Sequence, residues 1–136
     1  MPTGVRLVIP GVPPSLNRFA GRENSWEYRS EKKRWTEAVT WAAKAQRPAK
    51  PYKVADVKIL YYFPTRGRHD ADNYAGKFIL DGLTKGGIIV DDDFEHIRLG
   101  VAGAYDKDEP RTVITVTEIG GDHERTGDFS GGAAGL

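Results

Sequence analysis

The sequence predicts an α+β domain in which a small mixed sheet of about four strands packs against two helices. Two observations lead to this fold class: several stretches are rich in β-branched and aromatic residues, and two stretches carry apolar residues at helical spacing. A length of 136 residues with 39% hydrophobic content suits one domain around one core. We therefore expect a single folded domain over residues 1–119 and a flexible, glycine-rich tail over residues 120–136.

Composition narrows the functional classes. The chain has no cysteine, which excludes disulfides and thiolate metal sites. No apolar run reaches the roughly 20 residues that span a bilayer, and the first residues lack the basic and apolar regions of a signal peptide. We therefore expect a cytoplasmic protein without a membrane partner. The net charge is only +1, so any basic surface for a nucleic acid must be local.

The first elements are a strand and a proline-rich loop. Residues 5–9 (VRLVI) form a β-branched run that stops at Pro10-Gly11, which predicts a short strand. Residues 13–18 (PPSLNR) cannot easily continue a strand or begin a helix, because proline lacks an amide donor and has a fixed φ. This stretch is expected to be an ordered connection, and a simple turn is the plainer interpretation.

A helix and a central strand should follow. Ser30 is a suitable N-cap, Trp35 and Val39 recur at helical spacing, and the helix should end near Arg47, ahead of a proline. Residues 54–63 (VADVKILYYF) alternate regularly and are apolar toward their end. This pattern predicts a central, largely buried strand.

The second half predicts one more helix and two more strands. A helix is expected over residues 73–85, ended by Gly86-Gly87, which tolerate positive φ. Residues 97–105 and 112–119 read as strands, and the loop at residues 106–110 should join them as a hairpin. The apolar face of the predicted helix consists of Ala75, Phe78, Ile79, Gly82 and Leu83.

Carboxylates are concentrated between residues 65 and 97. Asp70 and Asp72 are two residues apart, so on extended backbone their side chains point to the same side. Like charges repel and resist desolvation, and divalent cations are the usual compensation. Carboxylate oxygens suit Mg²⁺, for which Mn²⁺ can substitute. The hypothesis is a Mg²⁺ site for phosphodiester chemistry, to which a second acidic group contributes: Asp91, Asp92 and Asp93.

The predicted helix separates the two acidic groups by about 20 Å. Either the sheet folds the second group beside the first, or a dimer completes the site. Lys77, in the first turns of that helix, could hold a phosphate or stabilise developing negative charge. The remaining basic candidates could contact neighbouring phosphates: Arg18, Arg66, Arg68, Lys32 and Lys33.

Each of these features also has a plainer interpretation. An Asp-x-Asp sequence often caps a helix, an Asp triplet is usually a solvated turn, and basic residues at a helix start usually face solvent. Lys77 and Asp81 have the spacing of a surface ion pair. Without a histidine-rich spacing, His69 and His96 are expected to be ordinary loop histidines. Only the conjunction of these features favours the metal site.

Two motifs resemble those of one known family. The stretch HDADNYAGKFILDGLTKGGIIVDDD and the earlier PPSLNR, followed by a strand ending TVTEI, resemble the RusA-type Holliday-junction resolvases. The resemblance covers residues 5–119. It implies a RusA-like fold and a small homodimeric, Mg²⁺-dependent endonuclease without an organic cofactor. Such enzymes nick four-way DNA junctions symmetrically and are common in phages and prophages.

The resemblance also assigns roles. Asp70 and Asp72 correspond to the first two essential carboxylates, Asp92 to the third with Asp91 as its neighbour, and Lys77 to the essential lysine. The third aspartate of the triplet leaves the choice within it open by one residue.

The chain departs from the family pattern before the lysine. Lys77 follows Asp72 by five residues where the family usually has four, so either the helix begins one residue later or Gly76 accommodates a bulge. A position that is often arginine is His69. Two alternatives stay open: a flap or branched-DNA nuclease of looser selectivity, and a branched-DNA-binding protein with weak or no catalysis.

Overall fold

A computed structural model of the protein describes residues 4–19, 21, 25–74 and 76–119. The predicted tail, residues 120–136, lies outside the described residues, so the domain boundary at residue 119 stays a prediction. The elements in chain order are β1 (Gly4–Pro10), the 3-10 turn η1 (Leu16–Phe19), α1 (Trp26–Lys44), β2 (Ala55–Phe63), the 3-10 turn η2 (Ala71–Tyr74), α2 (Leu80–Lys85), β3 (Ile97–Tyr105) and β4 (Arg111–Glu118).

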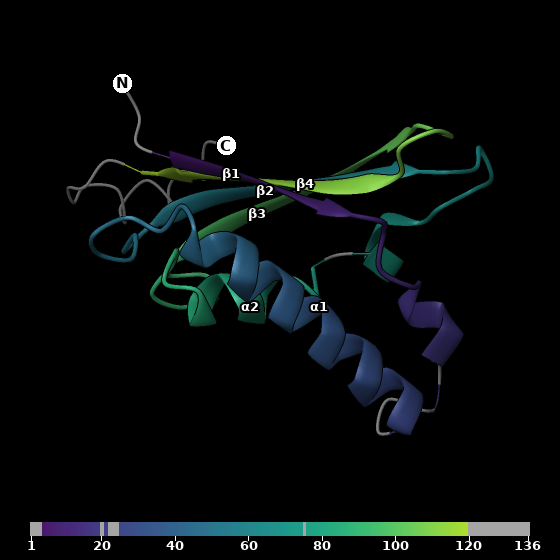
Figure 1. Ribbon diagram of the computed structural model, residues 1–136, viewed down its shortest axis with the longest axis horizontal. Coiled ribbons are helices and arrows are strands. Elements are labelled where there is room, and N and C mark those ends of the chain that lie inside the picture. The colour runs from purple at the N-terminus through teal and green to yellow at the C-terminus, as the bar shows by residue number, and fades with distance from the viewer. Residues whose placement is uncertain (1–3, 20, 22–24, 75, 120–136) are drawn as a thin grey trace.

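The strands form one mixed sheet in the order β1-β4-β2-β3. β4 is antiparallel to both of its neighbours, whereas β2 and β3 are parallel from the Ala55↔Ile97 pair to the Phe63↔Tyr105 pair. Both α-helices lie against the same face of this sheet (Figure 1). The predicted α+β class, with four strands and two helices, is confirmed.

The predicted hairpin between the last two strands is wrong, because β2 lies between β3 and β4. β2 buries alternate residues from Ala55 to Phe63 and half-buries several in between, whereas most of β3 is exposed. A strand that is covered on both faces belongs in the centre of a sheet. β2 is therefore central, as predicted, and β3 takes the edge.

Helix α1 begins and ends earlier than predicted. Its N-cap is Ser25 and not Ser30: the Ser25 hydroxyl accepts a hydrogen bond of 3.2 Å from the Tyr28 amide. Tyr28 is buried, so the apolar face extends about two turns further toward the N-terminus than Trp35, where the predicted pattern began. The helix ends at Lys44, three residues before the expected end at Arg47.

The second helix is shorter than the predicted 73–85. Residues 71–74 form η2, and α2 covers only residues 80–85. Gly76 lies between them with a φ of 123°, a value that a helix cannot contain and that residues other than glycine rarely adopt. The predicted helix end is confirmed, because α2 stops before Gly87, whose φ is 85°.

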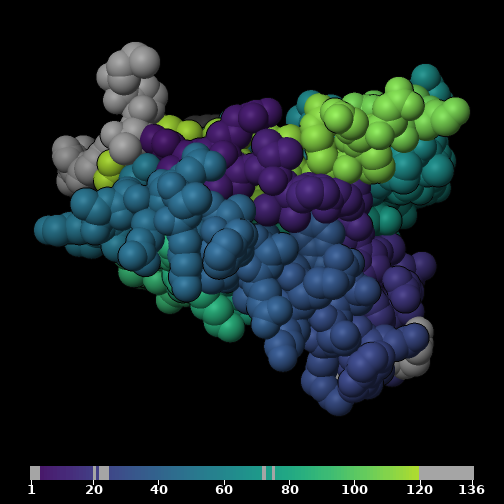
Figure 2. All heavy atoms as spheres, viewed as in Figure 1, coloured from purple at the N-terminus to yellow at the C-terminus, as the bar shows by residue number. Residues whose placement is uncertain are grey.

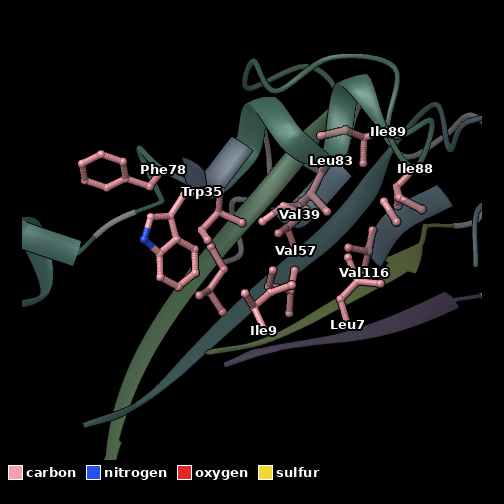
Figure 3. Close-up of a cluster of buried hydrophobic side chains, with 14 of the residues drawn as sticks. Leu7, Ile9, Trp35, Val39, Val57, Phe78, Leu83, Ile88, Ile89 and Val116 are labelled. Atoms are coloured by element: carbon pink, nitrogen blue, oxygen red, sulfur yellow. The ribbon is translucent and has the colours of Figure 1, made fainter. Parts of the chain in front are cut away.

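The core lies between the sheet and the helices (Figure 3). Leu83 of α2 and Val39 of α1 are fully buried there with Val57 of β2. Glycine allows the two helices to approach closely, because a Cβ built on Gly82 would lie only 2.5 Å from the Val39 Cβ. The buried face predicted for the second helix is thus confirmed for Phe78, Ile79, Gly82 and Leu83, although part of it is not helical; Ala75 lies outside the described residues.

Candidate active site

The first acidic group follows the carboxyl end of β2 on an aromatic support. The His69 ring stacks on Phe63, with centroids 3.8 Å apart and an interplanar angle of 4°, and Tyr74 meets Phe63 edge-on at 5.0 Å. Asp70 comes directly after His69, and its Oδ1 accepts a hydrogen bond of 2.9 Å from Arg68 Nε. The aromatic contacts fix the loop, so the Asp70 carboxylate is held in place although its side chain is half exposed.

The expected extended backbone between the two aspartates is not observed. The Asn73 amide donates to the Asp70 carbonyl at 3.0 Å, and the chain turns into η2 there. The backbone of Asp72 lies within this turn, while its side chain lies outside the described part of the chain.

Asp70 lines a pocket of about 150 Å³ against β3. Its lining includes Tyr61 of β2, Tyr74 of η2, and Val101 and Gly103 of β3. A neighbouring pocket of about 440 Å³ shares the walls formed by Phe63, His69 and Gly103 and contains Arg66. A carboxylate and a guanidinium therefore lie on adjoining sides of the same aromatic stack.

Two of the candidate DNA-contacting arginines, Arg66 and Arg68, lie near this group. Arg66 lies over the Tyr105 ring at 4.2 Å, and the exposed Arg68 pairs with Asp70. Arg18 belongs to η1 and lies over the Phe19 ring at 5.4 Å.

Lys77 is exposed in the turn between Gly76 and α2, not on a helix as predicted. The next residue, Phe78, is buried, and its ring centroid is 6.4 Å from that of Phe19. This packing brings the segment that carries Lys77 close to η1. Neither alternative for the extra residue is observed as stated, because Gly76 has a φ of 123° outside any helix and α2 begins only at Leu80.

The expected surface pair between Lys77 and Asp81 is replaced by a tertiary contact. Asp81 accepts a short hydrogen bond of 2.5 Å from Lys32 Nζ, 49 residues earlier on α1. Lys32 is thereby engaged within the protein, whereas Lys33 beside it is exposed.

The second acidic group precedes β3. It is held next to the start of β2, because the Val90 amide donates to the Tyr52 carbonyl at 3.1 Å. Asp93 then closes a turn: its Oδ1 accepts hydrogen bonds of 3.1 Å from the amides of Glu95 and His96 and lies 2.5 Å from His96 Nδ1. The hydrogen bond from His96 holds the pKa of Asp93 below its usual range.

Asp92 has a different environment. It lines a pocket of about 600 Å³ with Leu80 of α2, the exposed Phe94 and Leu99 of β3. Partial burial and then the charge of Asp91 raise the pKa of Asp92, and Asp81 adds to the effect. Negative charge is therefore less compensated at Asp92 than at Asp93.

Three potential metal ligands lie together here. One ligand atom each of Asp91, Asp93 and His96 falls within a span of 4.8 Å. His96 was expected to be an ordinary loop histidine, yet the Asp-x-x-His spacing at Asp93 was a short-range signal that could have identified the contact. The donor set, carboxylates with one imidazole, suits a divalent cation, but Asp93 and His96 already pair with each other at 2.5 Å, so we assign Asp93 to the turn.

The structure arranges the two acidic groups along one strand but in separate pockets. The pocket of Asp92 includes Leu99 and the pocket of Asp70 includes Val101. These β3 residues are two positions apart, so they share a face and lie about 7 Å apart along the strand. The two pockets share no lining residue, so both alternatives left open by the sequence, assembly of the site within one chain and its completion in a dimer, stay predictions.

Comparison with known proteins identifies the family. The family model described as endodeoxyribonuclease RusA matches residues 10–117. No match is found among the curated proteins. Among the helices in the described part of the chain, none has the length and apolar character needed to cross a membrane. The match covers most of the chain and contains β2, β3 and both acidic groups, and the chain therefore belongs to the RusA family of endodeoxyribonucleases.

Proposed function

We propose that this protein is a Mg²⁺-dependent endonuclease that resolves four-way DNA junctions by paired symmetric nicks. The observation that carries the proposal is the position of Asp70 and Asp92 in pockets along consecutive stretches of β3, within the region matched by the family model. A metal ion bound by both acidic groups would bring them to one phosphodiester group. The proximity of Arg66 and Arg68 supports binding of a polyanion at the same place.

The residues divide into three roles. Asp70, Asp72 and Asp92, with Asp91 beside them, would hold the metal ion, which supplies an activated water and polarises the phosphate. Lys77 would bind the phosphate or stabilise the charge that develops on it. Contacts with the DNA backbone would come from the basic side chains nearby: Arg18, Arg66, Arg68, Lys32 and Lys33.

A symmetric homodimer is part of this proposal. Two copies related by a two-fold axis would present two active sites to a junction that is itself nearly two-fold, so that opposite strands are nicked. Sedimentation of the protein with and without junction DNA measures this state, and a monomer on the junction would contradict it.

The decisive experiment is a nicking assay on a panel of branched DNA substrates with Mg²⁺ or Mn²⁺. Wild type should place symmetric nicks across a four-way junction. The Asp72→Asn variant should bind the junction and leave it intact. Asp108→Asn, in the loop after β3, is the matched control and should cleave as wild type does. Equal cleavage by wild type and Asp72→Asn would reject the assignment.

The same assay separates the alternatives. Nicks at flaps and splayed arms without symmetric nicks on junctions would indicate a nuclease of looser selectivity. Binding without nicks in either metal would indicate a branched-DNA-binding protein. The position of Lys77 outside a helix, after a glycine turn, is the observation that favours this second candidate.

A further inference from the structure

A groove of about 680 Å³ runs along α1 on the side of α2, apart from the pockets that contain Asp70 and Asp92. The atoms of α1 (blue) form much of the lower surface in Figure 2. The groove residues on α1 include Lys33, Thr36, Trp41 and Lys44, and Lys85 of α2 completes its basic lining.

The charge of the groove suits a polyanion. Among the described residues, five basic side chains line it against two carboxylates, those of Glu37 and Asp81. Asp81 is already paired with Lys32 at 2.5 Å, so its charge is compensated within the protein. The surplus is positive although the net charge of the whole chain is only +1. Phosphate groups are the anions that such a local surplus would attract.

One aromatic side chain lies within this basic lining. Trp41 is 80% exposed, which leaves most of its indole surface in water. A single exposed tryptophan is not unusual on a protein surface. An exposed aromatic ring within a groove of cations is the combination that binds single-stranded nucleic acids, because bases stack on the ring while cations follow the backbone. Trp26 offers an internal comparison, since it is also exposed on α1 at 74% but does not line the groove.

The groove adjoins the candidate active site through α2. Leu80 lines the pocket of Asp92, and the next residue, Asp81, lines the groove. A strand that occupies the groove would therefore pass close to the pocket in which Asp92 lies.

We propose that the groove between α1 and α2 binds a DNA strand with unpaired bases, with phosphates at Lys33, Lys44 and Lys85 and one base stacked on Trp41. The choice of DNA as the polyanion rests on the proposed function. The base must be unpaired because only an unpaired base can stack on the Trp41 ring. Duplex DNA offers phosphates to the same lysines but keeps its bases stacked on one another, so it would not use the indole ring.

The test measures binding of the full chain to an oligo-dT of about 16 nucleotides, the upper range of such sites. Trp41→Ala should weaken binding by about fivefold or more. Trp41→Phe should retain most of the affinity, and Trp26→Ala should behave as wild type. An oligonucleotide of the same length with abasic sugars should bind wild type about fivefold more weakly than oligo-dT and should not distinguish Trp41→Ala from wild type.

The lysines are tested by salt dependence. For the double variant Lys44→Ala/Lys85→Ala, the slope of log K against log salt should become shallower by about 1.4, since each lost single-strand phosphate contact contributes about 0.7. Equal oligo-dT affinity of wild type and Trp41→Ala, or an unchanged salt slope in the double variant, would overturn the proposal. So would a loss of duplex binding in Trp41→Ala as large as the loss of oligo-dT binding.

These outcomes are independent of the catalytic proposal. If wild type never nicks junctions but Trp41→Ala loses oligo-dT binding, the groove proposal stands and the nuclease proposal is rejected. If wild type nicks junctions and all groove variants bind oligo-dT as wild type does, the nuclease proposal stands and the groove proposal is rejected.

Discussion

Asp70 follows β2 and rests beside a stacked histidine and phenylalanine, whereas Asp91–Asp93 precede β3 in a turn that their own carboxylates help to build. In the first region aromatic packing and Arg68 hold the acidic group. In the second region Asp93 takes the local hydrogen bonds, and Asp92 is left with a raised pKa beside Asp91. The difference shows that adjacent aspartates of one turn can have different environments: the Asp93 carboxylate accepts the hydrogen bonds of the turn, and the Asp92 carboxylate does not.

The largest expected effect tests this division within the triplet. Asp92→Asn should lower junction cleavage by more than about 100-fold, because losing even an outer partner of a metal ligand costs about 10- to 100-fold. Asp93→Asn should cleave at close to the wild-type rate, because the Asp93 side chain accepts the hydrogen bonds that stabilise the turn. Single-turnover nicking with Mg²⁺ measures both. Equal losses in the two variants would show that the triplet acts as one ligand group.

The next effect concerns the turn between the two acidic regions. Gly76→Ala should lower the free energy of unfolding by about 1–3 kcal/mol, because alanine is strained at a φ of 123°. It should also reduce cleavage, since the turn positions Lys77. Gly87→Ala is the control: its φ of 85° is also strained, but it lies beyond α2, so chemical denaturation should show a loss of stability without a specific loss of cleavage.

A smaller effect should appear in the pH dependence of stability. The pKa of Asp93 is lowered in the folded protein, so its stabilising contribution is complete above the unfolded pKa of about 3.9 and is lost as the pH falls through the folded value. Asp93→Asn should therefore lower Tm at pH 7 in the presence of a chelator, and the gap to wild type should close toward pH 3. A constant gap across that range would mean that the carboxylate charge is not what stabilises the turn.

The smallest effect is expected at the ion pair of the first region. Arg68 is 88% exposed and pairs with Asp70 at 2.9 Å. Such pairs contribute at most about 1 kcal/mol, so Arg68→Ala should change the free energy of unfolding by less than that. Junction binding at low salt should weaken more clearly, since a phosphate contact is lost. A marked loss of stability with unchanged binding would assign Arg68 to the fold alone.

The features predicted most accurately from the sequence are the strands, whose positions depend on the pattern of neighbouring residues. Residues 97–105 form β3 with the predicted bounds, and the alternation of residues 54–63 identified the central strand. The helix start was missed because Ser30 and Ser25 are both acceptable caps, and only the burial of Tyr28 decides between them.

Features that depend on distant residues could not be predicted in this way. The hairpin failed because β4 pairs with β1 and β2, and nothing in the loop at residues 106–110 encodes those partners. Lys32 and Asp81 are 49 residues apart, so their ion pair follows from the packing of α1 on α2 and not from helical spacing. The site assignments of Asp70, Asp72, Asp92 and Lys77 remain predictions that the cleavage assays address.

The parallel pairing of β2 and β3 has a consequence for how this protein can change over evolutionary time. Parallel neighbours cannot be joined by a tight turn, so the chain must leave the sheet after Phe63 and return at Ile97. Asp70, Lys77 and Asp92 all lie on that single excursion. The exposed loops of that excursion can change in length without shifting the register of any strand, whereas Phe78, Ile79 and Leu83 are buried in the core. The candidate site residues thus lie on a connection and not on the strands, so the loop before Lys77 can differ in length while the sheet stays the same.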